Sequence, residues 1–301
     1  MERNNQKKKY SRQDSFAIAV FVLPALVVFL MFVIYPIFPE LKISLQNHNG
    51  TVSKGFVGLK NYVTVLTSAS FLKSQINTFL AVAINLLIGL PISLMFALLM
   101  DRVSPRVRNF FKVASVFPAV LSVTVIGKMW VAIYDPQWGI VNTVLRAIGM
   151  DSLTRVWLGD VDTVMICVII AYFWQFLGLN GLQLYTGIKA IPKTYYEAAQ
   201  IDGANFWVAS FKITVPLLQD IMKYVITTST LGSLGMFSYV SVMTKGGPGF
   251  ASRTISYEMY YRAFSASKFG EGCAVAVIFI IESVIISLLI NRFIAREKIE
   301  Y

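Results

Sequence analysis

Two apolar stretches of the sequence carry aromatic, amide and hydroxyl side chains at the spacing of one helix face. The first stretch contains Tyr172, Gln175 and Phe176. The second repeats small, polar or flexible side chains every three or four residues: Ser229, Gly232, Ser233 and Met236. Aromatic faces stack on C–H surfaces while amides and hydroxyls form hydrogen bonds, so this set suits a neutral, hydroxyl-rich ligand and needs no charge. Small residues are also common where membrane helices cross, which makes helix packing the alternative interpretation.

Residues for covalent or metal chemistry are scarce. The one histidine, His48, stands in a polar segment, and both cysteines, Cys167 and Cys273, lie within apolar runs without a C-x-x-C pair. A lone histidine is a poor metal ligand, and no apolar run contains a nucleophile with a histidine base. The sequence also lacks the G-x-x-x-x-G-K-[ST] pattern that holds nucleotide phosphates. We therefore expect no catalytic residue, no metal site and no enzymatic activity in this chain.

A polar segment between two later apolar runs has a distinctive residue order: Glu197-Ala198-Ala199, three residues, Gly203, nine residues, Ile213, one residue, and Val215-Pro216. Pro192 suits the first turn of a helix, and residues 193–200 are good helix formers. Ala198 and Ala199 would leave that helix a flat surface that another protein can approach closely. Glu197 adds a charge at one edge of this surface.

The end of the predicted helix is also defined by residue type. Gly203 breaks the helix because glycine adopts a positive φ without strain, and Asp202 or Asn205 can cap the helix that follows. The segment is therefore predicted to be a short helix joined rigidly to a membrane span, a form that transmits displacement. An interfacial loop without a partner is the alternative.

The composition places these segments in a membrane. Of the 301 residues, 56% are hydrophobic and only 14% are charged, whereas soluble domains carry about 25% charged residues. The net charge of +11 would suggest nucleic-acid binding in a soluble protein. Here the basic residues flank apolar runs, so membrane topology and anionic lipid headgroups explain them and nucleic acid is excluded as a partner.

Six segments are long and apolar enough to cross a bilayer, which takes roughly 20 residues. They are residues 16–38, 77–100, 110–134, 163–188, 217–242 and 272–291. The first is longer than the apolar core of a cleaved signal and lacks a cleavage pattern, so it is expected to remain as an anchor. The sequence therefore predicts an all-α membrane protein with six transmembrane helices.

Lys and Arg residues predict the orientation of these spans, because they concentrate on the cytoplasmic side. They are enriched in the N-terminal tail, in residues 101–109, in the Glu197 segment and in the C-terminal tail. Both termini and the Glu197 segment are thus predicted to be cytoplasmic. The last outer loop disagrees, since it contains Lys245, Arg253, Arg262 and Lys268.

The stretch from Tyr196 to Asn205 resembles the EAA loop of the binding-protein-dependent ABC sugar permeases of the maltose/multiple-sugar type. Val215 is the one departure, because the family prefers leucine there. Weaker resemblances extend the match from about Asn77 to Arg292: Phe117-Pro118-Ala119, residues 135–142, Trp157-Leu158, Gly246-Gly247-Pro248 and residues 260–264. These weaker stretches, more than the loop, favour a carbohydrate as the solute.

The resemblance implies an ABC importer permease fold, here divided into a cytoplasmic tail (1–15), a first transmembrane helix (16–38), an extracellular loop (39–76), a five-helix core (77–293) and a second cytoplasmic tail (294–301). It implies a cytoplasmic coupling helix within residues 189–216, whose contacts to an ATPase would be made by Glu197, Ala198, Ala199, Asp202 and Gly203. It also assigns to the solute pathway the helix faces described above, together with Ala119.

The resemblance further implies an assembly in a bacterial cytoplasmic membrane. A second homologous permease would complete a heterodimer, two cytoplasmic ATPase subunits would bind ATP and Mg²⁺, and an extracellular binding protein would deliver the solute. This chain would need no cofactor of its own.

Other interpretations stay open at this point. Within the same class, the solute could be glycerol-3-phosphate or another small polar molecule, for which Lys128 is the nearest basic candidate. An ion-coupled secondary transporter would need a relay of membrane acids or bases, whereas Glu282 is the single acid at mid-span. The roles of Glu282 and Asn85 are undecided, and residues 257–264 suit either membrane anchoring or contact with an outer partner.

Overall fold

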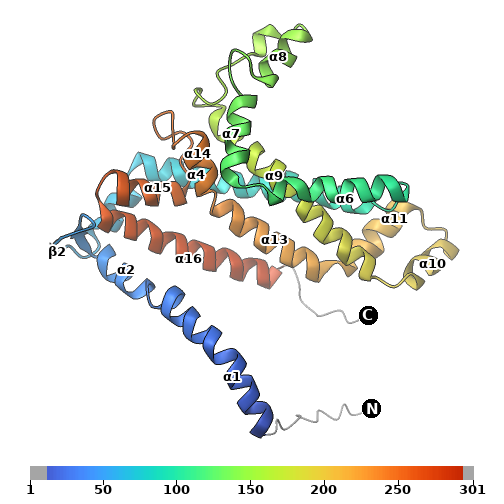
Figure 1. Cartoon of the computed structure of the whole chain (residues 1–301), viewed down its shortest axis with the longest axis horizontal. Coiled ribbons are helices and arrows are strands. Elements are labelled where there is room, and N and C mark those ends of the chain that lie inside the picture. The colour runs from blue at the N-terminus through green and yellow to red at the C-terminus, as the bar shows by residue number, and fades with distance from the viewer. Residues whose placement is uncertain (1–11, 294–301) are drawn as a thin grey trace.

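The computed structural model describes residues 12–293, which are almost entirely helical. Four helical stretches are long and apolar enough to cross a membrane, and six spans result if each of two bent helix pairs counts as one. Figure 1 shows an elongated body in which α6, α13 and α16 run lengthwise. The short helices α10 and α11 lie at one end, and a two-stranded hairpin lies at the other.

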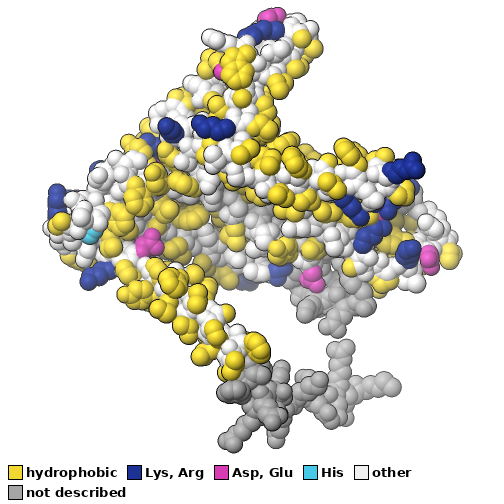
Figure 2. All heavy atoms as spheres, in the orientation of Figure 1, with side chains coloured by type: hydrophobic (Ala, Val, Ile, Leu, Met, Phe, Trp, Pro, Cys, Tyr) yellow, Lys and Arg dark blue, Asp and Glu magenta, His cyan; other side chains and the backbone are white. Residues whose placement is uncertain are grey.

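The first span is longer than the sequence predicted. Helix α1 (Arg12–Phe29) continues through the π-helical turn Leu30–Ile34 into α2 (Ile37–Ser44), and the apolar stretch runs from Ala19 to Ser44. The predicted end of the span at residue 38 was wrong. Pro36 and Pro39 do not stop the helix, because they lie at the start of α2, where the missing N–H of a proline removes no helical hydrogen bond. Figure 2 shows hydrophobic side chains along this rod, which projects from the body.

The segment predicted as an outer loop, residues 39–76, is largely structured. Strands β1 (Gln46–His48) and β2 (Ser53–Phe56) pair as an antiparallel hairpin, followed by α3 (Lys60–Leu66). Helix α4 (Ala69–Ile84) then begins eight residues before the predicted start of the second span at residue 77. The prediction counted only uncharged residues, whereas the helix also includes the half-buried Lys73 in its first turns.

Three π-helical turns each end two residues before a proline. They are Leu30–Ile34 before Pro36, Asn85–Gly89 before Pro91, and Ser210–Thr214 before Pro216. Proline lacks an N–H and its ring crowds the carbonyl one turn earlier, so the wider turn lets the helix continue past it. In this way α4 continues into α5 (Leu90–Leu99) as a single span.

The third predicted span is not one straight helix. Helix α6 (Pro105–Val120) and helix α7 (Val123–Ile133) meet at 99°. Leu121 has an extended backbone, and the side chain of Ser122 caps α7 by accepting from the Val125 N–H. The continuous helix predicted over residues 110–134 was therefore wrong. Together with α8 (Ile140–Ala147), helix α7 forms an arm that leaves the body (Figure 1).

The remaining helices form the core and one end of the body. Helix α9 (Val164–Ala190) leads through α10 (Thr194–Ile201), α11 (Phe206–Ala209) and α12 (Val215–Leu217) into α13 (Gln219–Leu234). Helix α14 (Phe237–Met243) follows α13 at a bend of 42°. Helix α15 (Ile255–Tyr260) and the long α16 (Phe269–Phe293) complete the described chain.

Glycines allow α9 to pack closely against its neighbours. A methyl group on Gly178 would lie 2.5 Å from the Ser115 carbonyl oxygen of α6, and one on Gly181 would lie 3.1 Å from the Ser93 carbonyl oxygen of α5. Small residues permit such backbone approaches between membrane helices. Helices α5, α6 and α9 therefore form one tightly packed layer, which holds the polar side chains of α9 in fixed positions.

Candidate functional site

A cavity of about 360 Å³ lies between the middle of α9 and the helices α13 and α14. Its wall combines aromatic rings, amides, hydroxyls and glycines: Val123, Tyr172, Phe176, Leu179, Asn180, Gln183, Tyr224, Thr228, Ser229, Gly232, Gly235, Met236, Ser238 and Tyr239. None of these lining side chains is an acid, a lysine or an arginine. The chemistry of the wall is therefore stacking and neutral hydrogen bonding.

Five of the predicted pathway residues lie on this wall: Tyr172, Phe176, Ser229, Gly232 and Met236. The other three predicted residues lie elsewhere. Ser233 is fully buried and its hydroxyl donates to the Ser229 carbonyl within α13. Ala119 is half-buried near the end of α6, and Gln175 is buried behind the wall. The buried position of Ser233 therefore fits the alternative interpretation, in which small residues serve helix packing.

Gln175 organises the wall from behind. Its amide Nε2 donates to the Leu121 carbonyl at 2.9 Å, and its Oε1 accepts from the Tyr239 hydroxyl. The Leu121 carbonyl is free for this bond because the chain turns from α6 to α7 at that residue. The ring of Tyr239 then meets the ring of Tyr172 edge to face, with centroids 5.4 Å apart. Gln175 thus links α6, α9 and α14 directly behind the cavity.

Several lining residues were not predicted from the sequence. Asn180 and Gln183 continue the helix face of Phe176, and Tyr224 and Thr228 precede Gly232 on its own face. The same spacing of three to four residues could have identified them. The buried Gln183 Oε1 has no hydrogen-bond partner in the described structure, and a buried amide oxygen without a partner is costly. A hydroxyl donor in the cavity would satisfy it.

The predicted coupling segment forms a projecting helix, α10. Glu197 and Ala198 are exposed on it, and Ala199 is buried. Gly203 has a φ of +75° and ends the helix, the positive φ expected of a glycine in this position. Asn205 caps α11, since its side chain accepts from the Val208 N–H at 2.9 Å.

Next to this helix lies an open groove of about 590 Å³. Four of the predicted coupling residues line it: Ala198, Ala199, Asp202 and Gly203. Apolar side chains that line it are exposed, including Tyr195 at 44% and Val208 at 38%. Exposed apolar groups clustered around a projecting helix are typical of a surface that binds another protein.

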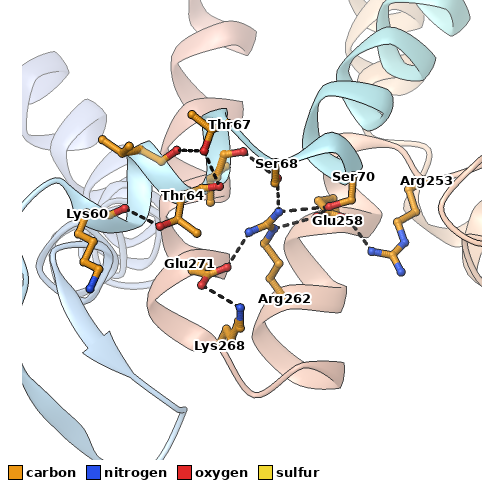
Figure 3. A network of polar contacts seen from close by, with 12 residues as sticks. Lys60, Thr64, Thr67, Ser68, Ser70, Arg253, Glu258, Arg262, Lys268 and Glu271 are labelled. Atoms are coloured by element: carbon orange, nitrogen blue, oxygen red, sulfur yellow. Dashed lines mark hydrogen bonds and ion pairs between the residues drawn. The ribbon is translucent and has the colours of Figure 1, made fainter.

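Three of the four basic residues in the predicted last outer loop, Arg253, Arg262 and Lys268, belong to a polar network (Figure 3). Glu258 of α15 accepts from the Arg253 and Arg262 guanidinium groups at 2.9 and 2.8 Å, and Arg262 also reaches Glu271 at 2.6 Å. Ser70 of α4 donates to the same Glu258 carboxylate at 2.7 Å. These positive charges therefore hold α4, α15 and α16 together, which explains why they depart from the charge pattern of the other loops.

The acid at mid-span, Glu282, has a partner within the chain. Its carboxylate accepts from the Gln75 amide of α4 at 2.5 Å, whereas the second Glu282 oxygen and the Gln75 oxygen have no described partner. Asn85 is buried in the π-helical turn and its Nδ2 is also unpartnered. Glu282 therefore belongs to a helix contact away from the cavity wall.

No group of three or more His, Cys, Asp or Glu residues within the described range could hold a metal ion. His48 is therefore not part of such a group, and its Nδ1 accepts a hydrogen bond from the Gly50 N–H. Cys167 and Cys273 are both buried and unpaired by disulfides.

Comparison with known proteins gives a consistent result. Residues 68–299 match the family model described as "Binding-protein-dependent transport system inner membrane component". The chain is 35% identical to the probable ABC transporter permease protein YurN of Bacillus subtilis (strain 168), over 93% of this chain and 97% of that protein. It is 31% identical to the arabinooligosaccharides transport system permease protein AraP of the same organism, over 90% of this chain and 86% of that protein.

A solved structure shares the fold. A chain of a bacterial ABC transporter involved in the import of the acidic polysaccharide alginate superimposes with a TM-score of 0.80. The superposition covers 93% of this chain and 95% of that chain, at 22% sequence identity. The overall fold is thus one that a chain of a known transporter also adopts.

Proposed function

The chain belongs to the family of binding-protein-dependent transport system inner membrane components, and from that premise we propose that it is the permease subunit of an ATP-driven importer of carbohydrate in a bacterial cytoplasmic membrane. It forms half of the translocation pathway, and a second homologous permease supplies the other half. The chain itself is no enzyme and holds no cofactor, since ATP and Mg²⁺ bind to two cytoplasmic ATPase subunits.

The uncharged wall of the cavity is the observation that carries the choice of solute. Tyr172, Phe176 and Tyr239 offer ring faces, while Asn180 and Gln183 offer amides. A phosphorylated solute such as glycerol-3-phosphate would favour a basic group in the wall, yet Lys128 is exposed on α7 and does not line the cavity. The relative AraP, named for arabinooligosaccharide transport, supports an oligosaccharide or sugar derivative.

The mechanism that fits is alternating access driven through α10. An extracellular binding protein delivers the solute to the outer side. Closure of the ATPase dimer displaces α10 and its neighbours, and the displacement opens the cavity outward; hydrolysis returns it inward. The two states are separated only by differential contacts, so the ATPase must hold the α10 surface more tightly in one of them. Glu197, Ala198, Ala199, Asp202 and Gly203 provide that surface.

The orientation follows from the same assignment. If α10 meets cytoplasmic ATPases, the hairpin end with β1 and β2 faces outward, because Figure 1 places it at the opposite end of the body. Both chain termini then belong to the cytoplasmic side, in agreement with their basic residues. The predicted tails, residues 1–15 and 294–301, lie largely outside the described residues.

Replacing Gly203 by valine tests the coupling role. The φ of Gly203 is +75° with open space around it, so valine meets strain rather than a clash, at a cost of about 1–3 kcal/mol. We expect this strain to distort the α10 surface and to abolish ATP-dependent uptake of labelled oligosaccharide, while the membrane content of the protein persists.

Gly149→Val is the matched control. Gly149 follows α8 on the projecting arm, with a φ of +76° and equally open surroundings, so it carries the same local strain far from α10. Uptake by the Gly149→Val variant should stay close to that of the parent. Normal uptake by the Gly203→Val variant would contradict the proposed role of α10.

A further inference from the structure

The turn between α5 and α6 contacts the coupling segment on both sides of α10. Asp101 accepts from Lys189 Nζ at 2.6 Å, and Lys189 lies in the last turn of α9, just before α10. The next residue, Arg102, places its guanidinium carbon 4.1 Å from the ring centre of Phe206, the first residue of α11, just after α10. Two consecutive residues of one short turn therefore reach both ends of the segment that contains α10.

A cavity of about 430 Å³ separates the α5–α6 turn from α10 and α11, and Asp101, Arg102, Lys189 and Phe206 all line it. Close packing does not fill the space between these elements. The contacts of Asp101 with Lys189 and of Arg102 with Phe206 therefore connect the turn to the coupling segment at the border of this cavity.

Asp101 also connects to α6. Arg108, in the first turns of α6, places NH1 3.4 Å from the Asp101 carboxylate and donates to the Met100 carbonyl through Nε at 3.0 Å. The Tyr185 hydroxyl of α9 donates to the same carboxylate at 2.9 Å. Burial raises the pKa of Asp101, but the bonds from Lys189 and Tyr185 outweigh it and lower the pKa. The carboxylate is thus ionised and shared by the turn, α6 and α9.

The other end of α6 reaches the cavity proposed for the solute. Along its length α6 is seated against Gly178 of α9. At its far end the Leu121 carbonyl accepts from Gln175, which in turn accepts from Tyr239. A continuous helix therefore joins the contacts beside α10 to the hydrogen bonds behind the cavity wall.

We propose that Asp101 and Arg102 are positioning residues for coupling: they attach the α5–α6 turn to the segment that contains α10, so that α6 moves with α10 and carries the movement to Gln175. This inference rests on the proposed function of the chain as an ATP-driven permease. It adds a second line of transmission beside α9, which leads directly from the cavity to α10. Neither residue contacts the solute.

The test measures the conformation of the cavity rather than uptake, so no particular sugar is needed. A cysteine reporter, Ser238→Cys, is placed on the exposed part of the cavity wall. The complete transporter, purified through a tag on this chain, is labelled with a water-soluble maleimide without nucleotide and with MgATP plus vanadate. ATP hydrolysis and the subunit composition of each preparation are measured in parallel.

In the parent reporter, nucleotide should change the labelling rate several-fold. Asp101→Asn and Arg102→Ala should remove most of that change while the complex stays assembled and hydrolyses ATP. Asp101→Glu keeps the charge and should restore much of the response. Arg106→Ala is the matched control, because Arg106 is exposed at the start of α6, has no described partner and removes the same charge; it should respond like the parent.

An unchanged nucleotide response in both Asp101→Asn and Arg102→Ala would overturn the inference. So would loss of assembly in both variants, since the two residues would then serve stability and not transmission. A parent complex that carries no ATPase, or whose cavity ignores nucleotide, would instead refute the proposed function. The two failures are therefore distinguishable.

Discussion

Of the two glycines that line the cavity, Gly232 is the one where an added methyl group would meet a close neighbour. A Cβ at this position would lie 2.5 Å from the Tyr172 hydroxyl oxygen. That hydroxyl is near the Ser229 carbonyl, and the ring packs against Phe176 at a centroid distance of 5.2 Å. Gly232→Ala should therefore displace the Tyr172 ring. Overpacking of this kind costs about 1–3 kcal/mol, and we expect a comparable loss in kcat/KM for uptake.

Gly235→Ala is the control for this prediction, because Gly235 lines the same cavity but its Cβ would meet its nearest neighbour at an ordinary 3.5 Å. Uptake kinetics are measured at equal membrane content. If Gly232→Ala and Gly235→Ala have equal kinetics, the Tyr172 ring does not shape the pathway.

Among single residues, the sequence predicts lining positions only as far as helical spacing reaches. Tyr172 and Phe176 share a face of α9, and that face does line the cavity. Gln175 has similar chemistry but bonds to the Leu121 carbonyl and the Tyr239 hydroxyl of neighbouring helices, whereas Ser233 bonds to the Ser229 carbonyl of its own helix. The environment of Gln175 depends on where α6 and α14 pack, and spacing along one helix carries no information on its neighbours. The functional roles of these residues stay predictions.

At the scale of helices, Gly178 determines how closely α6 approaches α9. A methyl group there would lie 2.5 Å from the Ser115 carbonyl oxygen and 2.8 Å from the Ser115 Cα. Backbone atoms cannot rotate away, so Gly178→Ala should separate the two helices and destabilise the protein by about 1–3 kcal/mol. Thermal unfolding of the detergent-solubilised protein measures this loss.

Gly187→Ala serves as the comparison. Its added methyl group would meet the side-chain carbons of Ile221 and Leu218 at 2.6 and 3.0 Å, and side-chain ends can shift at lower cost. We therefore expect a smaller decrease in unfolding temperature than for Gly178→Ala. The reverse order would show that the α6–α9 contact is looser than the geometry indicates.

The polar network that joins α4, α15 and α16 predicts a pH dependence of stability. Burial raises the pKa of Glu258. The bonds donated by Arg253 and Ser70, and the charge of Arg262, outweigh burial and hold the pKa below the ordinary 4.5. The unfolded chain therefore binds this proton more readily than the folded chain. The stabilisation is complete above the unfolded pKa and is lost as the pH falls through the folded pKa.

Glu258→Gln isolates this contribution. At neutral pH the variant leaves two buried guanidinium groups without their carboxylate, a change that costs about 3–5 kcal/mol for a broken buried ion pair. The difference in unfolding free energy between parent and variant should narrow as the pH is lowered below about 4.5, the ordinary pKa. A difference that stays constant down to strongly acidic pH would contradict the low pKa.

The helices themselves show where prediction from sequence succeeds and where it stops. Long uncharged stretches such as that of α9 are predicted because apolar length alone defines a span. The turn between α6 and α7 was missed because Leu121 and Ser122 resemble ordinary span residues; only the capping bond of Ser122 and the partner of the Leu121 carbonyl reveal it. Apolar length also gives no sign of the π-helical turns that accommodate Pro36 and Pro91.

For the whole molecule, large apolar side chains are exposed along several helices. No residue of α1 or α2 in the apolar window of the first span is buried in the isolated chain, and lipid or the proposed second permease would cover that surface. The cavity is lined by α9, α13 and α14 with Val123 of α7, which would form one side of the proposed pathway. The family could be inferred from the Glu197 loop. The identity of the proposed partners could not, because it depends on residues that belong to other chains.

The purified chain alone should therefore neither transport nor hydrolyse ATP. Its sequence has no phosphate-binding glycine loop, and its mid-span acid, Glu282, bonds to Gln75 instead of joining a described relay. Liposomes that contain only this chain should accumulate no labelled oligosaccharide, with or without an imposed ion gradient. Liposomes that contain the complete transporter, with binding protein outside and ATP inside, should accumulate it. Gradient-driven uptake by the lone chain would require an ion pathway and would favour a secondary transporter, because an ABC permease has no means to use that energy by itself.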